Sequence, residues 1–263
     1  MGRIPFVYAL LSAAAMFAAA VPASAQAPVT PEALRVEVVA KHPHQADTFS
    51  EGLYFHQGML LESVGGLRRK PSLIRQVDIA SGVAMQEIEI EQALTTKDIC
   101  IANGRMTILS YDSGAAVDFD AVSFKRQGVR LYSGTGRGLT FDGRHYIMSS
   151  GSSVLQWRHP ETFEVVSTRT VTMLDMPHEY LGDLEYVDGV LYAVVHTQDR
   201  ILRINPESGV VTGVVSAGGL IPQAGRTIDM LLSGMAHDPG SGAFYLTGRN
   251  WPHVFEVRFV PAM

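Results

Sequence analysis

Five polar residues recur at equivalent points of the chain, each directly before a short apolar run. They are Glu51, Lys97, Arg137, Asp183 and Ser233. Core packing requires no polar residue at such points. Carboxylates, cations and a hydroxyl in one place can bind a polar substrate and transfer protons. The pattern therefore predicts that these side chains meet in a substrate-binding site.

A second polar set follows the next apolar run of each copy. Glu62 comes directly after Met59–Leu61, where we expect partial desolvation to raise the pKa of its carboxyl group toward a catalytically useful value. Tyr111, His196 and Arg249 lie at or just beyond the same point in other copies. These three residues are predicted to line the same site.

Two acidic residues and two histidines have the spacing of metal ligands. Asp183 and Glu185 alternate along one predicted strand, so they share a face, and mutual repulsion should raise the pKa of one of them. The pair could bind a cation, or one member could pair with Arg137 or Lys97. The His42–His44 segment alternates in a similar way, but we interpret it as a surface turn. We therefore predict no resident metal and no cofactor.

A hairpin that occurs five times must position these residues. Each copy has an apolar strand, a turn carrying Gly and a second apolar strand. Asn-Gly and Asp-Gly at several bends tolerate the positive φ angles of tight turns. The copies are Gly52–Leu61, Asp98–Leu109, Gly138–Met148, Leu184–Val194 and Gly234–Leu246.

The spacing of the copies indicates the fold. All but the last hairpin are followed by a second strand pair, and the copies are 40 to 50 residues apart. Four strands per unit at this spacing is typical of β-propeller blades. We therefore predict an all-β, five-bladed β-propeller, closed by an N-terminal strand, Leu34–Ala40, that completes the last blade. A β-sandwich is the alternative, but it does not explain the recurrence.

The composition excludes several classes of protein. The 263 residues are 46% hydrophobic and 18% charged, with a net charge of -5. Disordered chains and coiled coils do not combine so much apolar content with so little charge. A nucleic-acid binder needs a dense basic face, which an acidic chain without long Lys/Arg runs does not offer.

Residues 1–25 have the pattern of a signal peptide. Arg3 precedes the apolar run Phe6–Val21, and Ala23–Ala25 forms a small-x-small cleavage site. A membrane anchor is the alternative, but the run is shorter than the ~20 residues that a span needs. We expect a single domain over residues 26–263, periplasmic or secreted, monomeric and free of the membrane after cleavage. Cys100 lies in an apolar strand and is predicted to be a buried, inert thiol.

Six motifs resemble those of the plant- and bacterial-type glutaminyl-peptide cyclotransferases, a family of five-bladed propellers. The resemblance runs from about Val36 to Phe259, and the order and spacing of the motifs make it specific. The motifs are Thr48–Leu53, Leu61–Leu67, Gly136–Thr140, Leu181–Glu185, Leu232–Ala236 and Thr247–Pro252.

This resemblance implies an activity. The α-amine of an N-terminal glutamine, on a peptide or protein, attacks its own γ-carboxamide and expels ammonia. Glu62 matches the family's essential glutamate and would shuttle the proton. Arg249 and the indole N–H of Trp251 would stabilise the oxyanion, with Tyr111 and Trp251 as aromatic walls.

Several site positions differ from the family pattern. Glu51 stands where the family has Gln, Arg137 where it has Trp, and Ser233 where it has Asn. The alternative function is therefore a diverged or inactive propeller that binds a peptide or small ligand at a charged channel mouth.

Overall fold

The computed structural model describes residue 2 and residues 28–66, 70–91, 94–221 and 224–262. These residues form strands and connecting turns without a helix, which confirms the all-β prediction. Apart from Gly2, the predicted signal peptide lies outside the described residues. Among those residues, no helix has the length and hydropathy to span a membrane.

Three separate four-stranded antiparallel sheets follow one another along the chain. The first contains β2 (Ser50–His56), β3 (Met59–Val64), β4 (Ser72–Val77) and β5 (Ala84–Ile90). The second contains β6 (Thr96–Ala102), β7 (Arg105–Ser110), β8 (Ala115–Asp120) and β9 (Arg126–Leu131). The third contains β10 (Gly138–Phe141), β11 (Tyr146–Ser149), β12 (Val154–Arg158) and β13 (Val165–Thr170).

An eight-stranded sheet consists of two further four-stranded units. One unit is β16 (Leu181–Val187), β17 (Val190–Val195), β18 (Arg200–Ile204) and β19 (Val211–Ser216). The other is β20 (Leu232–His237), β21 (Phe244–Gly248), β22 (His253–Pro261) and β1 (Glu32–Pro43). A small ribbon, β14 (Thr172–Met173) with β15 (Met176–Pro177), precedes β16.

The five predicted hairpins correspond to β2–β3, β6–β7, β10–β11, β16–β17 and β20–β21. At three of the bends, Gln57-Gly58, Asn103-Gly104 and Asp188-Gly189, both residues have positive φ angles, between 49° and 83°. Two consecutive positive φ angles match the right-handed twist of the flanking strands. The turn residues therefore set the register of these inner hairpins.

The N-terminal strand lies where the sequence predicted it. β1 pairs antiparallel with β22, with Val36 opposite Phe259 and Val38 opposite Val257. The first residues of β1, Glu32–Arg35, also pair in parallel with Gly213–Ser216 of β19. That second pairing was not predicted, and it joins the last two units into one sheet.

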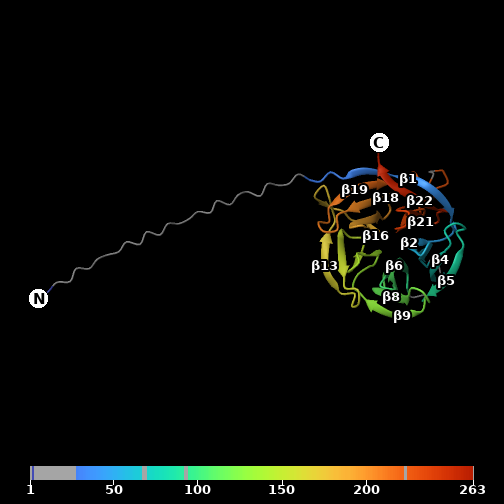
Figure 1. Ribbon diagram of the computed structural model, residues 1–263, viewed down its shortest axis with the longest axis horizontal. Coiled ribbons are helices and arrows are strands. Elements are labelled where there is room, and N and C mark those ends of the chain that lie inside the picture. The colour runs from blue at the N-terminus through green and yellow to red at the C-terminus, as the bar shows by residue number, and fades with distance from the viewer. Residues whose placement is uncertain (1, 3–27, 67–69, 92–93, 222–223, 263) are drawn as a thin grey trace.

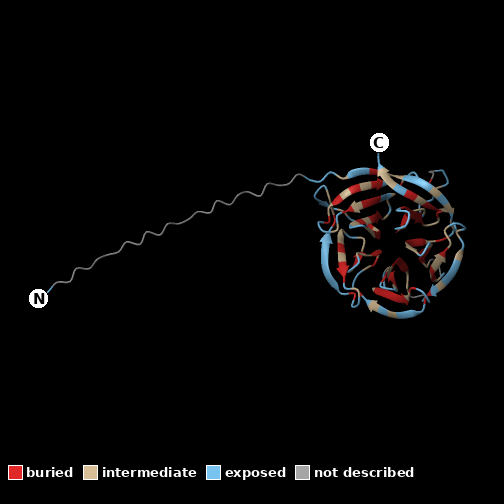
Figure 2. Ribbon diagram, viewed as in Figure 1, coloured by how far each residue is buried: buried red, intermediate tan, exposed pale blue. Residues whose placement is uncertain are grey.

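The inner strands of the five units form a closed ring. Contacts join β2 to β6, β6 to β10, β10 to β16, β16 to β20, and β20 back to β2. Figure 1 shows β2, β6 and β16 near the centre of the ring, with β5, β9 and β13 at its rim. In Figure 2 the inner strands are mostly buried and the outermost strands mostly exposed.

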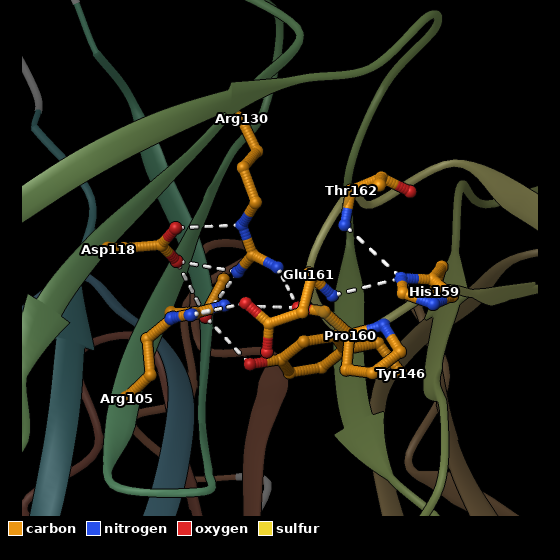
Figure 3. Close-up of polar contacts among 9 residues, drawn as sticks. Arg105, Asp118, Arg130, Tyr146, His159, Pro160, Glu161 and Thr162 are labelled. Carbon is orange, nitrogen blue, oxygen red and sulfur yellow. Dashed lines mark hydrogen bonds and ion pairs between the residues drawn. The ribbon is translucent and has the colours of Figure 1, made fainter.

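Apolar clusters fill the spaces between adjacent units, and polar networks supplement them. Figure 3 shows one network, between the second and third units. Arg130 binds both oxygens of Asp118, at 2.6 and 2.7 Å, and donates to the carbonyl of Pro160 at 2.6 Å. Arg105 donates to the same carbonyl and pairs with Glu161. Because these charges are paired with one another, we interpret the network as a structural link between units.

Candidate functional site

A small pocket opens where the inner strands begin. We call it the mouth pocket. Its polar lining residues are Glu51, Lys97, Arg137, Asp183, His196 and Ser233, together with Gly182, Val194 and Leu232. The structure thus brings together all five residues of the first predicted set, and His196 of the second.

A buried carboxylate with two cations forms one wall of the mouth pocket. Glu51 is 5% exposed. Its Oε2 lies 2.7 Å from Nζ of Lys97, and Nη2 of Arg249 lies 2.9 Å from each of its oxygens. Burial and the charge of Arg249 lower the pKa of Lys97, despite the attraction of Glu51. The guanidinium of Arg249 also stacks 4.2 Å above the ring of Phe49.

Tyr111 links this wall to Arg137. Nζ of Lys97 lies 5.1 Å from the centre of the Tyr111 ring, and the guanidinium carbon of Arg137 lies 5.2 Å from it. Arg137 also donates to the Tyr111 hydroxyl at 3.3 Å. Tyr111 is therefore not a simple apolar wall, because it holds two cations by their attraction to its ring and hydroxyl.

His196 is exposed to the field of these cations. Burial, followed by repulsion from Arg137, Arg249 and Lys97, lowers the pKa of His196 to about 4. Its imidazole is consequently neutral at pH 7. The three cations thus oppose protonation of His196.

Asp183 pairs with a carboxyl group of a neighbouring unit. Both Asp183 and Asp98 are fully buried, and burial raises the pKa of Asp98 to about 7 and that of Asp183 well above its ordinary value. Oδ1 of Asp183 has no hydrogen-bond partner among the described residues, and the charge of Asp98 adds to burial in raising the pKa of Asp183. Asp183 also accepts from the backbone N–H of Met235 at 2.7 Å.

Glu185 lies outside the mouth pocket lining, and it too is buried with a raised pKa, caused first by burial and then by Asp98. The expected repulsion is present, since Glu185 contributes to the raised pKa of Asp183, but the expectation was incomplete because burial and Asp98 contribute more. Neither Asp183 nor Glu185 forms an ion pair with Arg137 or Lys97 among the described residues. Within the same part of the chain, no three His, Cys, Asp or Glu side chains are arranged to hold a metal ion.

Glu62 is buried in an ion pair and does not line the mouth pocket. Its Oε1 accepts from Nε2 of His44 at 2.9 Å and from the Ser50 hydroxyl. Burial raises the pKa of Glu62, but the hydrogen bonds and charge of His44, with the Ser50 bond, outweigh it and leave the pKa lowered. The expectation of a raised pKa at Glu62 was therefore wrong, because it took no account of His44.

His44 is a buried imidazolium. Nδ1 donates to the carbonyl of Trp251 at 2.7 Å while Nε2 donates to Glu62. Burial lowers the pKa of His44, but these two partners raise it by more. The interpretation of His42–His44 as a surface turn was wrong, because His42 belongs to β1 and the His44 side chain, which follows that strand, is buried against Glu62.

Trp251 and Cys100 are buried. Trp251 is 1% exposed, and its indole N–H has no hydrogen-bond partner among the described residues. It lies outside the mouth pocket lining, so its predicted contact with the oxyanion stays a prediction. Cys100 is buried, as expected, and burial raises the pKa of its thiol.

Sequence reasoning missed Asp98, Ser50 and the role of His44. Asp98 directly follows Lys97, at a point where three other copies have Gly, and that difference could have drawn attention to it. Ser50 and His44 carry no comparable signal. Their contacts with Glu62 depend on how β1 and β2 pack, which the repeat alignment does not describe.

Comparisons with known proteins identify the family. The family model described as glutamine cyclotransferase matches residues 9–259. The chain belongs to the glutamine cyclotransferase family. A glutaminyl-peptide cyclotransferase of Arabidopsis thaliana is 27% identical over 232 residues, which are 86% of this chain and 72% of the relative.

A solved structure supports the same assignment. The crystal structure of Myxococcus xanthus glutaminyl cyclase matches with a TM-score of 0.83 and 27% identity, covering 89% of this chain and all of that one. The glutamine cyclotransferase match includes every strand that contributes to the mouth pocket. The predicted family is therefore confirmed.

Proposed function

We propose that this chain is a five-bladed propeller that converts the N-terminal glutamine of peptides or proteins to pyroglutamate, with release of ammonia, in the mouth pocket. Family membership supports the reaction class. The observation that carries the proposal is the buried carboxylate of Glu51, placed between two cations in the lining of the mouth pocket.

The reaction needs few protein groups. The α-nitrogen of the substrate attacks its own side-chain carbonyl carbon, forming the ring bond, while the proton that it loses goes to a carboxylate. The carboxylate returns a proton to the departing amide nitrogen, which leaves as ammonia. Since both reacting groups belong to one residue, the pocket mainly has to hold them in a near-attack geometry.

Residues of the mouth pocket can fill these roles. Glu51 can bind the substrate ammonium group and accept its proton. Lys97 and Arg249, both within 2.9 Å of Glu51, can stabilise the oxyanion that develops on the attacked carbonyl. Ser233 can orient the amide, because its hydroxyl donates to the Ser50 carbonyl at 2.7 Å and can still accept from the amide N–H.

Glu62 is the carboxylate that the family resemblance assigns to proton transfer, and that role stays a prediction. Position favours Glu51 as the proton acceptor, since Glu51 lines the mouth pocket. Glu62 lies outside that lining and is bound by His44 and Ser50. We propose that Glu62 acts as a positioning residue. Glu62 accepts a hydrogen bond from Ser50, and this bond fixes Ser50, which directly precedes Glu51 in the chain.

A mass-spectrometric assay tests the proposed function. Purified protein is incubated with a peptide that begins with Gln and with a matched peptide that begins with Asn. Loss of ammonia from the Gln peptide alone, faster than with heat-inactivated protein, is the expected result. An equal rate with active and inactivated protein would refute the enzymatic proposal.

A second candidate function is peptide binding without turnover. The observation that favours it is the occupation of both Glu51 oxygens by cations, which reduces the capacity of that carboxylate to accept a proton. In that case the mouth pocket would retain an N-terminal peptide unchanged. Calorimetric titration of a peptide that the protein does not convert would distinguish the two candidates.

We also propose that the protein is exported and acts as a monomer in the periplasm or outside the cell. The support is the signal-peptide pattern of residues 1–25. The substrates would then be the N-termini of exported peptides or proteins.

A further inference from the structure

The mouth pocket has an excess of positive charge. Three cations, Lys97, Arg137 and Arg249, lie at or beside it, and Glu51 is their one ionised carboxylate partner among the described residues. The other acidic lining residue, Asp183, forms no ion pair with these cations among the described residues, and burial raises its pKa. His196 also lines the mouth pocket, and burial, followed by repulsion from the three cations, lowers its pKa.

Arg137 is the cation that no carboxylate neutralises. No ion pair joins it to an acidic residue within the described part of the chain. It donates a hydrogen bond to the Tyr111 hydroxyl, and its guanidinium lies over the Tyr111 ring. On another side, Gly151 approaches closely, because a Cβ built there would lie 2.6 Å from Nε of Arg137. The side chain is therefore held in place while its charge remains available.

We propose that Arg137 forms an anion subsite. It selects substrates that carry an acidic side chain at the second or third residue of the peptide, the N-terminal glutamine being the first. This inference rests on the proposed function, because it assumes that the first residue occupies the space beside Glu51. A planar guanidinium binds a carboxylate through two parallel hydrogen bonds. The ligand class is thus an acidic peptide N-terminus.

The distances allow this arrangement. Glu51, Lys97, Tyr111 and Arg137 follow one another around the mouth pocket, each in contact with the next. An extended peptide advances about 3.3 Å per residue. With its amine at Glu51, a peptide can therefore present its second or third side chain to Arg137.

Three peptides and two variants test the subsite. The peptides begin Gln-Glu-Glu, Gln-Ala-Ala and Gln-Lys-Lys, with amidated C-termini so that the side chains provide the added charge. The variants are Arg137→Gln and a matched control, Arg144→Gln. Arg144 is exposed in the β10–β11 turn. Arg137 directly precedes the first residue of β10, so the two arginines lie at opposite ends of that strand.

We expect kcat/KM to be highest for the acidic peptide and lowest for the basic one. The acidic peptide should exceed the neutral one by about fivefold, the effect of one favourable, partly exposed charge pair. Arg137→Gln should abolish that ratio, and Arg144→Gln should leave it unchanged. Raising the salt concentration to 1 M, where the screening length is about 3 Å, should also reduce it.

The outcomes separate this inference from the proposed function. Turnover with equal kcat/KM for all three peptides would overturn the subsite and leave the proposed function intact. Absence of turnover, with calorimetric binding that follows the acidic order and depends on Arg137, would support the subsite and refute the catalytic proposal. Absence of both turnover and binding would overturn both.

Discussion

Glu51 and Lys97 occupy equivalent positions of two successive hairpins, and their side chains form an ion pair of 2.7 Å across the boundary between the two sheets. Inner strands that converge on one centre bring residues distant in sequence into contact. Arg249, from the last unit, completes the pair on the other side of Glu51. The mouth pocket is thus assembled from residues of all the units, and its charge depends on each of them.

The His44–Glu62 pair should stabilise the protein in a defined pH range. The pKa of Glu62 is lowered from 4.5, so its contribution is present above pH 4.5 and is lost as the pH falls through the folded value. The pKa of His44 is raised from 6.5, so its contribution is present below pH 6.5 and is lost as the pH rises through the folded value.

We therefore expect His44→Gln to lower the free energy of unfolding by about 3 kcal/mol near pH 6, since it leaves a buried carboxylate without its partner. For a chain of this size that is a decrease of about 6 to 12 °C in melting temperature. Scanning calorimetry at pH 6 and pH 9 checks this. The double variant His44→Gln with Glu62→Gln should recover part of the loss, and an equal loss at both pH values would contradict the assignment of an imidazolium.

The Asp98–Asp183 pair should make the protein less stable as the pH rises. Both folded pKa values are raised from 3.8, that of Asp98 to about 7. The folded state then binds more protons than the unfolded state, so stability decreases between about pH 4 and the folded pKa values. Asp183→Asn mimics the protonated form and should flatten this decrease. Melting temperatures of parent and variant from pH 5 to pH 9 test it, and parallel curves would count against a shared proton.

Strand β1 should be needed for the closed ring. It joins β22 to β19, and its removal would expose the edges of both strands. A chain that starts at His42 should therefore melt well below one that starts at Val29, and it should aggregate more readily. Equal melting temperatures for the two chains would show that β1 does not close the structure.

Export should expose Gln26 as a new N-terminus, because cleavage is expected after Ala25. An N-terminal glutamine is itself a substrate of the proposed reaction, so the mature protein should carry pyroglutamate. Mass analysis of the exported protein checks both steps. Retention of Met1 would contradict cleavage, whereas a free Gln26 would contradict self-processing alone.

The sequence predicted the inner hairpins and the residues of the mouth pocket for one physical reason. Equivalent positions of repeated units converge in space, so Glu51, Arg137 and Ser233 could be placed together without knowledge of the packing. Turn residues such as Asn103-Gly104 fixed the register of the hairpins.

Contacts between non-equivalent positions could not be found in this way. The pairing of β1 with β19 depends on where the N-terminal strand crosses the sheet. Likewise, the link from His44 to Glu62 joins the segment after β1 to β3, and it reverses the pKa shift expected from the apolar neighbours of Glu62. The interaction of Asp98 with Asp183 could not be found from the repeat, because Asp183 is equivalent to Lys97 and not to Asp98.

The central claim is that Glu51, in the mouth pocket, transfers the proton during cyclisation of N-terminal glutamine. The most direct measurement is the turnover of a Gln-initiated peptide by the parent, Glu51→Gln and Glu62→Gln, each at a temperature where it is fully folded. Since loss of a general acid–base group decreases the rate about 10²- to 10⁴-fold, Glu51→Gln should fall by that factor and Glu62→Gln by much less. A Glu51→Gln variant that turns over at the parent rate, with Glu62→Gln inactive, would contradict the account.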